Sequence, residues 1–233
     1  MIDSSAPGVI LALTIGYLIG SIPWAYVIVR VVAHEDVTQH GTGNVGAMNV
    51  RRSTGSWAWF TVAMFADGFK GLIPVAVAKG VVGDFSITWL IAPAGTQATA
   101  SYLPLLLPQA VFAGTVLGHN YSLWMALLKR KFARTGKGLA TGGGALLAYD
   151  WRYFMAVVAV GLAVIAITRY MMAGQVAAAL TLPVAAVALR SPDWPFMLVM
   201  GLLVYVAHHK RFMGLLDGRE PKLYINDRMG PRG

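Results

Sequence analysis

Long apolar stretches alternate with short polar segments along this sequence of 233 residues. About 20 consecutive apolar residues are enough for a helix to span a bilayer, so each long stretch predicts a membrane crossing. The pattern therefore predicts an all-α integral membrane protein, a seven-transmembrane-helix bundle with crossings near residues 6–31, 57–79, 103–122, 138–150, 152–169, 173–190 and 194–210.

Three segments modify this pattern. Residues 138–150 would form a helix of about 20 Å, which is shorter than a hydrocarbon core of ~30 Å. We therefore expect a short fourth helix that begins at a glycine-rich loop and reaches only partway across. Residues 85–102 are interrupted by Pro93 and Gly95, so we expect an outer loop or a re-entrant segment there. The Gly-Ser-Ile-Pro run at 20–23 predicts a kink and close helix packing in the first crossing.

The composition agrees with a membrane protein. Hydrophobic residues make up 57% of the chain and charged residues only 12%, with a mean hydropathy of +0.60. Soluble domains carry about 25% charged residues, so this chain lacks the polar surface of a water-soluble globule. A cleaved signal peptide is the alternative for the first stretch, but no Lys or Arg precedes it. The absence of cysteine excludes disulfide bonds and thiol chemistry.

Basic residues predict the orientation of this bundle. With seven crossings, 15 of the 19 lysines and arginines fall on one side and three on the other. Because positively charged loops stay in the cytoplasm, we expect the N-terminus outside, the C-terminus inside, and cytoplasmic loops near 33–56, 119–138 and 208–222. The basic residues that give the net charge of +9 lie next to the predicted crossings, which favours anionic lipids and not nucleic acid as partners.

Two glycine-rich segments on the predicted cytoplasmic side have the chemistry of phosphate-binding loops. The first runs from Gly41 to Asn49 and the second from Gly136 to Gly144. Glycines allow tight turns that bring backbone N–H groups to a ligand, and Thr, Asn and Lys side chains add donors. The second segment is not a Walker A motif, which requires G-x-x-x-x-G-K-[ST] after a strand. Together the two segments predict phosphate binding at the membrane surface.

Charged residues inside predicted spans are costly and point to function. Asp67 and Lys70 share a helix face in the second crossing and can pair, either to fix the helix register or to face a polar cavity. We expect His119 to be a hydrogen-bonded structural residue. His208 belongs either to an interfacial cationic belt or to a contact with a substrate hydroxyl. No histidine has carboxylate or thiolate partners at metal-ligand spacing, so we expect no metal site.

In their order and spacing, these motifs resemble those of the bacterial acyl-phosphate:glycerol-3-phosphate acyltransferases, an integral membrane family that makes lysophosphatidic acid. The resemblance implies one transmembrane acyltransferase domain over residues 1–233, in the bacterial inner membrane, with no metal or other cofactor. It covers most of the chain and is carried by Gly20-Ser21-Ile22-Pro23, Asp36 before Gly41–Asn49 and Arg52, Asp67-x-x-Lys70-Gly71, Gly118-His119, Gly136-Lys137-Gly138-Leu139-Ala140-Thr141, and Leu215-Leu216-x-Gly218-x-Glu220 after His208.

The activity implied by the resemblance is transfer of a fatty acyl group from acyl phosphate to the sn-1 hydroxyl of glycerol 3-phosphate, with release of phosphate. Because acyl phosphate is already activated, no Ser or Cys nucleophile is needed. The implied catalytic residues are Lys137, His208 and Asn49. The implied phosphate-binding residues are Thr42, Gly43, Asn44, Gly46, Arg52, Gly136, Gly138, Thr141 and Arg211. The implied supporting residues are Asp36, Ser21, Asp67, Lys70 and His119.

The sequence departs from the usual family pattern at several positions. We expect Arg211 to hold the acceptor phosphate while His208 orients the glycerol hydroxyl; contact of Arg211 with lipid headgroups is the alternative. The departures also leave open a changed substrate or a lost activity. They are Thr42 for Ser, Thr38 for Arg, Met48 for Thr, Thr135 for Gly, Arg211 for Asn and Gly214 for Arg.

A transporter or non-catalytic binder of a phosphorylated metabolite is the rival hypothesis. Both classes would use phosphate-binding loops, so those loops do not separate them. A transporter is expected to carry internal inverted repeats and polar groups at the bilayer midplane. The sequence shows no such repeat, which favours the enzyme.

Overall fold

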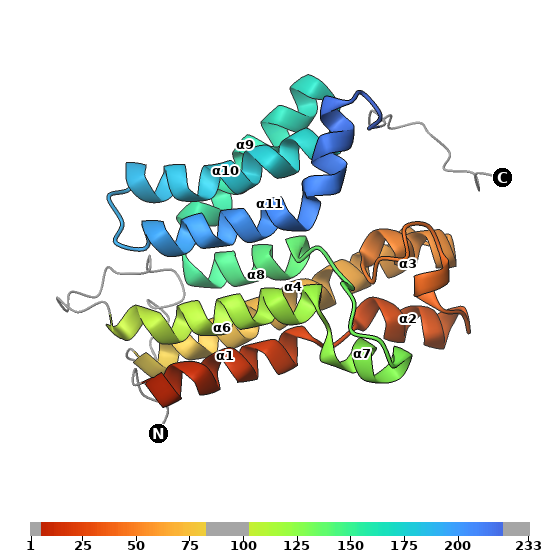
Figure 1. Ribbon diagram of the computed structural model, residues 1–233, viewed down its shortest axis with the longest axis horizontal. Coiled ribbons are helices and arrows are strands. Elements are labelled where there is room, and N and C mark those ends of the chain that lie inside the picture. Colours follow the sequence, from red (N-terminus) through yellow and green to blue (C-terminus); the bar gives the residue numbers. More distant parts are fainter. Residues whose placement is uncertain (1–5, 83–102, 221–233) are drawn as a thin grey trace. The chain divides into compact units, whose positions relative to one another are not determined.

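The computed structural model describes residues 6–82 and 103–220, and every regular element among them is helical (Figure 1). The chain divides into two compact units between Phe154 and Met155. The first unit contains α1 (Ala6–Gly20), α2 (Trp24–Val32), the short 3-10 helix η1 (Val37–Gln39), α3 (Ala47–Thr54), α4 (Trp57–Val82), α6 (Leu103–Asn120), α7 (Leu123–Lys129), α8 (Leu139–Tyr149) and the start of α9 (Trp151–Thr168). The second unit contains the rest of α9, then α10 (Met171–Ala188) and α11 (Trp194–Leu216).

Four described helical stretches are long and apolar enough to cross a membrane. They confirm helices at four of the predicted crossings and are Ala6–Val32, Trp57–Gly80, Trp151–Thr168 and Met171–Ala188. The crossings predicted at 103–122, 138–150 and 194–210 are also helical, as α6, α8 and α11, but do not belong to these four. The all-helical fold is thus confirmed for the described residues, while the count of seven crossings and their orientation stay predictions. The segment 85–102 lies outside the described residues.

The first crossing, predicted as one helix over 6–31, is two helices. Helix α1 ends at Gly20, and α2 begins at Trp24 directly after Pro23. Proline has no N–H and cannot continue the hydrogen-bond ladder, so the helix breaks at the predicted kink. The short helix over 138–150 is confirmed as α8, whose 11 residues span about 16 Å.

The predicted cytoplasmic loops contain more helix than the sequence pattern indicated. Helix α3 lies within 33–56 and is closed by Gly55, which adopts the left-handed conformation at φ +69°. Helix α7 lies within 119–138, and the Ser122 side chain caps it by accepting a hydrogen bond from the Met125 N–H. Helix α11 continues through most of 208–222 and ends at Leu216. Helices α3 and α7 have only eight and seven residues, so they lack the long apolar run on which the crossings were predicted.

Glycines form the contacts between the long helices of the first unit. On α1, a Cβ added at Gly16 or Gly20 would overlap the backbone of α6 at Val111 or Thr115. A Cβ at Gly71 on α4 would likewise overlap the Thr141 carbonyl of α8. Small residues let membrane helices approach closely enough for backbone contact. Figure 1 shows α1, α4, α6 and α8 running side by side as a result.

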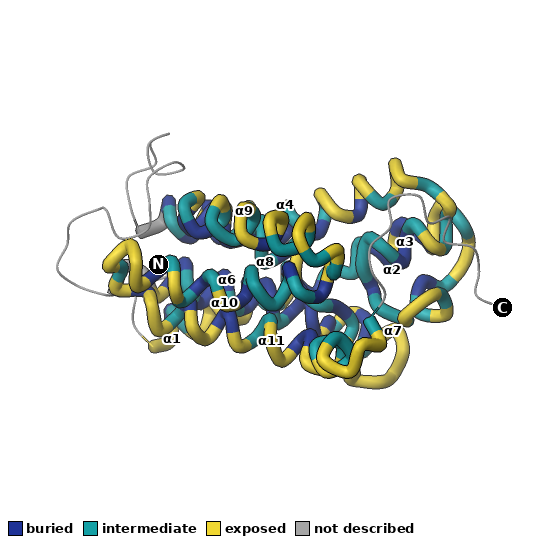
Figure 2. Tube along the Cα trace, turned by 90° about the horizontal axis from the view of Figure 1, so that it is seen from above, coloured by how far each residue is buried: buried dark blue, intermediate teal, exposed yellow. Residues whose placement is uncertain are grey.

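Apolar side chains remain exposed on the outer surfaces of these helices. Ile10, Phe65 and Ile73 are each more than half exposed. Figure 2 shows buried and exposed positions alternating along the helices. Apolar exposure on this scale is typical of surfaces that face lipid.

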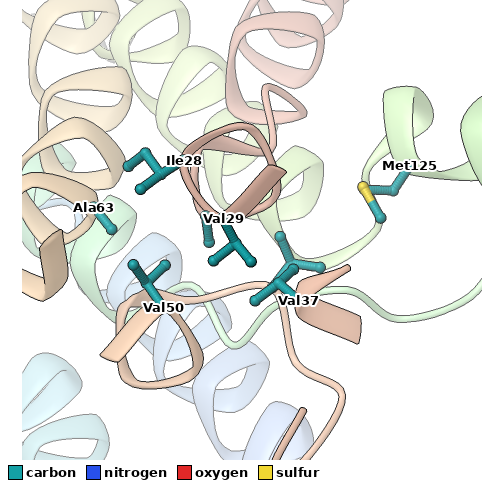
Figure 3. Packing of buried hydrophobic residues seen from close by; sticks show 8 residues of the cluster. Ile28, Val29, Val37, Val50, Ala63 and Met125 are labelled. Atoms are coloured by element: carbon teal, nitrogen blue, oxygen red, sulfur yellow. The ribbon is translucent and has the colours of Figure 1, made fainter. Parts of the chain in front are cut away.

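An apolar cluster fixes the short helices at one end of the first unit (Figure 3). It joins α2, η1, α3, α4 and α7, and its buried members are Ala25, Ile28, Val29, Val37, Val45, Val50, Ala63 and Met125. Val45 belongs to the first glycine-rich segment itself. Burial of a Val side chain is worth about 1.5–3 kcal/mol, so this cluster holds that segment in one place.

Candidate active site

Asn49 organises the first glycine-rich segment from the first turn of α3. The side chain is buried, and its Nδ2 donates hydrogen bonds to the carbonyls of His40 at 3.0 Å and Asn44 at 2.8 Å. The Arg52 guanidinium donates to Asn49 Oδ1 at 2.8 Å. Asn49 therefore holds the two ends of the turn together and orients an exposed arginine beside it.

Gly41 and Gly43 make the turn between those two ends. Both have positive φ, +54° and +68°, a conformation that glycine adopts without strain. A Cβ at Gly41 would lie 2.7 Å from both Asn49 Oδ1 and the Arg52 Cδ. The turn thus packs against the Asn49–Arg52 pair, and Thr42 at its tip is exposed.

Asp36 anchors the start of this segment. Its Oδ1 accepts from the N–H of Thr38 at 3.0 Å and from the Thr38 hydroxyl at 2.7 Å, and its other oxygen pairs with Lys129 at the end of α7. Burial raises the pKa of Asp36, but the hydrogen bonds from Lys129 and Thr38 outweigh it and hold the pKa below the usual value of 3.8. The Asp36–Lys129 pair therefore joins the first segment to α7.

The second glycine-rich segment lies at the N-terminus of α8. Gly138 precedes the helix with φ +74°, and no side chain caps its first turn. Gly136 and Gly138 are buried, and a Cβ at Gly136 would overlap the ring of His119. The unpaired N–H groups and the dipole of a helix N-terminus favour an anion. Thr141 is fully buried in this first turn, and its hydroxyl makes no hydrogen bond within the described residues.

A backbone hydrogen bond links the two segments. The Val45 N–H donates to the Thr135 carbonyl at 2.7 Å. Val45 directly precedes Gly46, the residue before α3, and Thr135 directly precedes Gly136. The structure therefore brings together the two segments that the sequence singled out, although they lie about 90 residues apart along the chain.

A buried cluster of charged and titratable side chains adjoins the second segment, where the ring of His119 lies against Gly136. Lys70 Nζ is 2.8 Å from Asp67 Oδ1, which confirms the predicted pair, and His119 Nδ1 lies 3.7 Å from the same oxygen. Lys70 also donates to the Ile22 carbonyl at 2.8 Å, in the break between α1 and α2. All three charged or titratable side chains are less than a tenth exposed. The cluster ties α4 and α6 to that break.

Ser21 occupies the same break. It is fully buried, its carbonyl accepts from the Ser122 hydroxyl, and its own hydroxyl accepts from the Leu123 N–H at 3.3 Å. These contacts attach α7 to the end of α1. Ser21 therefore fixes the start of α7, which lies between the two segments along the chain.

His208 and Arg211 belong to α11 in the second unit. His208 is buried, and its Nδ1 lies 2.8 Å from the Val204 carbonyl. A carbonyl only accepts, so Nδ1 carries the proton and Nε2 of the neutral ring is an acceptor. The Arg211 guanidinium forms two hydrogen bonds with the Glu220 carboxylate, at 2.8 and 2.6 Å. This partner of Arg211 was not predicted from the sequence.

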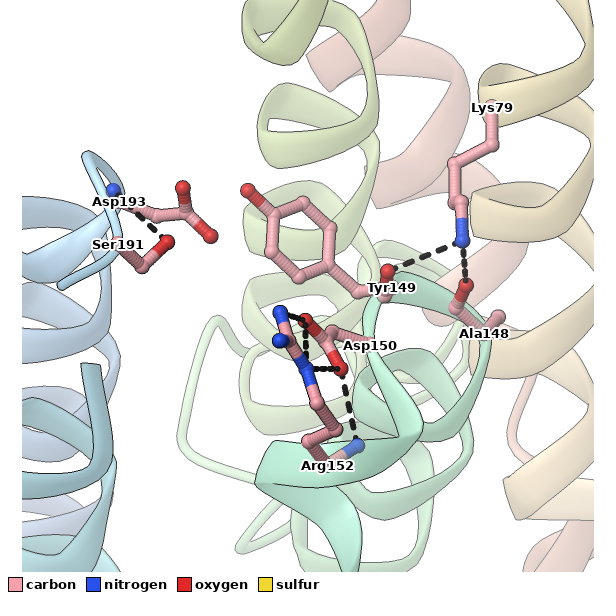
Figure 4. A network of polar contacts seen from close by, with 7 residues as sticks. All are labelled: Lys79, Ala148, Tyr149, Asp150, Arg152, Ser191 and Asp193. Atoms are coloured by element: carbon pink, nitrogen blue, oxygen red, sulfur yellow. Dashed lines mark hydrogen bonds and ion pairs between the residues drawn. The ribbon is translucent and has the colours of Figure 1, made fainter. Parts of the chain in front are cut away.

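A further polar network, which the sequence did not predict, closes the C-terminus of α8 (Figure 4). Lys79 Nζ donates to the carbonyls of Ala148 and Tyr149 at 2.9 and 3.1 Å. The buried Asp150 that follows pairs with Arg152 at 2.8 Å. A cation at a helix C-terminus satisfies orphan carbonyls and complements the dipole. The signal in the sequence was a lysine at the end of one crossing and a short neighbouring helix.

No group of three or more His, Cys, Asp or Glu side chains is placed to hold a metal ion within residues 6–82 and 103–220.

Comparison with known protein sequences identifies relatives of this chain. A family model described as glycerol-3-phosphate acyltransferase matches residues 10–218. A glycerol-3-phosphate acyltransferase of Thermus thermophilus is 34% identical over 91% of this chain and 93% of that protein. A protein of the same name from Mesorhizobium japonicum is 32% identical over 93% of this chain and 96% of its own length.

Solved structures agree with the sequence comparison. The crystal structure of PlsY (YgiH), an integral membrane glycerol 3-phosphate acyltransferase, in its glycerol 3-phosphate form superposes with a TM-score of 0.73 at 26% identity, covering 93% of this chain and 96% of that one. The lysophosphatidic acid form gives a TM-score of 0.72 at 25% identity. With a family model over most of its length and relatives above 30% identity, the chain belongs to the glycerol-3-phosphate acyltransferase family.

Proposed function

We propose that this protein transfers a fatty acyl group from acyl phosphate to the sn-1 hydroxyl of glycerol 3-phosphate, producing lysophosphatidic acid and phosphate in a bacterial inner membrane. The observation that carries this proposal is the link between the two glycine-rich segments, made by the Val45 N–H and the Thr135 carbonyl at 2.7 Å. It sets the N-termini of α3 and α8 on one structural frame. The names of the relatives and of the solved PlsY forms support the acceptor and the product.

Acyl transfer forms one bond to the acyl carbon and breaks another. The acceptor hydroxyl oxygen attacks the acyl carbon, the bond from that carbon to the phosphate oxygen breaks, and the hydroxyl proton ends on the released hydrogen phosphate. Both substrates bring phosphate charge, so cations and N–H donors are needed to offset their repulsion.

We assign the donor phosphate to the second segment. The N-terminus of α8 offers N–H groups, the buried Thr141 offers a hydroxyl, and Lys137 between Gly136 and Gly138 offers a positive charge. A leaving phosphate gains negative charge as the acyl bond breaks. Donors that are already oriented toward that charge lower the barrier without reorganising.

We assign further phosphate contacts to the first segment. Thr42, Gly43, Asn44 and Gly46 form its turn, and Asn49 orients Arg52 through the 2.8 Å hydrogen bond to its Oδ1. A guanidinium binds phosphate bidentately, which makes Arg52 suited to this task.

In α11 we assign roles toward glycerol 3-phosphate to His208 and Arg211. Nε2 of the neutral His208 ring accepts a hydrogen bond from the glycerol hydroxyl and orients it. Arg211 has five N–H donors, of which Glu220 takes two, which leaves donors for the acceptor phosphate.

Lys137 provides the test. A charge-assisted hydrogen bond to phosphate contributes about 1.5–3 kcal/mol, so Lys137→Ala is expected to lower kcat/KM for acyl phosphate by roughly 10–150-fold. Lys137→Arg restores little, because a planar fork does not replace a compact ammonium group in a tight turn. The measurement is lysophosphatidic acid formed by purified protein from acyl phosphate, with acyl-CoA as the comparison donor.

Lys131→Ala is the matched control, since Lys131 is an exposed lysine between α7 and the second segment. Unchanged activity in Lys131→Ala with a loss in Lys137→Ala supports the assignment. Wild-type turnover in Lys137→Ala removes Lys137 from the site. Binding of acyl phosphate without turnover by the wild-type protein contradicts the enzyme and favours a binder.

A further inference from the structure

Thr135 lies where three parts of the first unit meet, and its hydroxyl makes contacts in two directions. Its Oγ1 is 3.0 Å from the His119 carbonyl and 3.2 Å from the Asn120 carbonyl, and it accepts a hydrogen bond from the Ser122 N–H at 3.2 Å. The Thr135 N–H donates to the Asn120 carbonyl at 2.7 Å. Carbonyls in the last turn of a helix lack intrahelical partners, so Thr135 caps the C-terminus of α6.

That end of α6 belongs to a rigid frame. Ser122 is buried and donates through its hydroxyl to the carbonyl of the buried Ser21. The ring of His119, one residue before Asn120, packs against Gly136 and lies 3.7 Å from Asp67. Thr135 is thus attached to groups that are themselves fixed by buried hydrogen bonds and an ion pair.

From this frame, Thr135 reaches both glycine-rich segments. Its carbonyl accepts a hydrogen bond from the Val45 N–H, and Val45 is held in the apolar cluster two residues before the start of α3. Its own peptide continues directly into Gly136 and Lys137. A shift of Thr135 would therefore change the spacing between the N-termini of α3 and α8.

We propose that the Thr135 hydroxyl positions the two glycine-rich segments relative to each other, and that Thr135 is a positioning residue for acyl transfer. The inference rests on the proposed function for its catalytic consequence, while the structural coupling stands independently of it. Each segment keeps its own ligand contacts when the hydroxyl is lost, and only their separation changes. The effect is therefore expected mainly in kcat.

The test compares Thr135→Val, which keeps the shape and removes the hydroxyl, with Thr135→Ser, which keeps the hydroxyl. Thr115→Val is the matched control, because Thr115 is a buried threonine on α6, the helix that Thr135 caps, and its hydroxyl donates to the Phe112 carbonyl at 2.8 Å. A mutation far from the reacting atoms that misplaces them by about 1 Å can lower the rate by about 10²-fold. We therefore expect kcat of Thr135→Val to fall by about 10–100-fold. Thr135→Ser and Thr115→Val are expected to stay within about threefold of wild type, because neither disturbs the capping hydroxyl.

Hydrogen exchange supplies a second readout that does not need turnover. In Thr135→Val the amides of Val45 and Gly136 are expected to exchange faster, with α1 and α4 unchanged. Equal kcat in Thr135→Val and wild type, equal losses in Thr135→Val and Thr135→Ser, or faster exchange throughout the protein overturns the inference. If Thr135→Val does not fold, Thr135→Ala gives the same comparison. An inactive wild-type protein would refute the proposed function, and the exchange of Val45 would still decide whether Thr135 couples the segments.

Discussion

The buried Asp67–Lys70 pair gives the strongest stability prediction. Lys70→Met keeps most of the side-chain length but removes the ammonium group that lies 2.8 Å from both Asp67 Oδ1 and the Ile22 carbonyl. The two side chains are only 3% and 4% exposed, so water cannot replace the lost contacts. Removing one partner of a buried pair costs about 3–5 kcal/mol, because it leaves an uncompensated charge.

The double variant Asp67→Asn, Lys70→Met separates that penalty from a simple loss of packing. Replacing both charges of a buried pair is often close to neutral, so we expect the double variant to recover most of the stability lost in Lys70→Met. For a chain of 150–250 residues, 1 kcal/mol corresponds to about 2–4 °C in Tm, which predicts a drop of roughly 6–20 °C for the single variant.

The assay is thermal unfolding in one detergent, followed by the fluorescence of the seven tryptophans. Lys131→Met serves as the exposed control. A Tm within about 3 °C of wild type for Lys70→Met, which corresponds to roughly 1 kcal/mol, would refute the reasoning. So would a double variant whose loss equals the sum of the two single losses, because the charges would then be uncoupled.

Three further predictions concern other parts of the chain. Hydrogen bonds hold the pKa of Asp36 below 3.8, so its contribution to stability is complete above about pH 5 and is lost as the pH falls through the lowered folded-state pKa. In unfolding measured against pH, Asp36→Asn should lack this acid-dependent loss of stability. Lys79→Met leaves the last carbonyls of α8 without their cation, so we expect about 1–3 kcal/mol lower stability and faster exchange in α8, and unchanged exchange there would contradict the cap. A cysteine at Thr42 should resist an impermeant thiol reagent in intact cells, whereas one at Asp84 should react; labelling of the first from outside would reverse the predicted orientation.

The sequence predicted the elements that depend on composition and spacing alone. Long apolar runs were sufficient to place the long helices, although not the break between α1 and α2 or the short α3 and α7, and a short run between a glycine turn and Asp150 was sufficient to predict α8. The three-residue spacing of Asp67 and Lys70 was sufficient to predict their pair. These features are local, so they can be read from neighbouring positions along the chain.

Contacts between distant segments could not be predicted in the same way. Thr135 stood out only as a departure from the family pattern, and its bonds to Asn120 and Val45 depend on how α6, α7 and the first segment pack. The partner of Arg211 is Glu220, which a turn through Gly218 with φ +68° brings back toward α11. Tertiary packing sets both contacts, and spacing along the chain does not encode it.

The most direct measurement is a product balance with purified wild-type protein, acyl phosphate and glycerol 3-phosphate. The proposed reaction predicts lysophosphatidic acid and inorganic phosphate in equal amounts, with no product when glycerol 3-phosphate is omitted and none when acyl-CoA replaces acyl phosphate. Phosphate release without lysophosphatidic acid, or lysophosphatidic acid formed from acyl-CoA alone, would contradict the account.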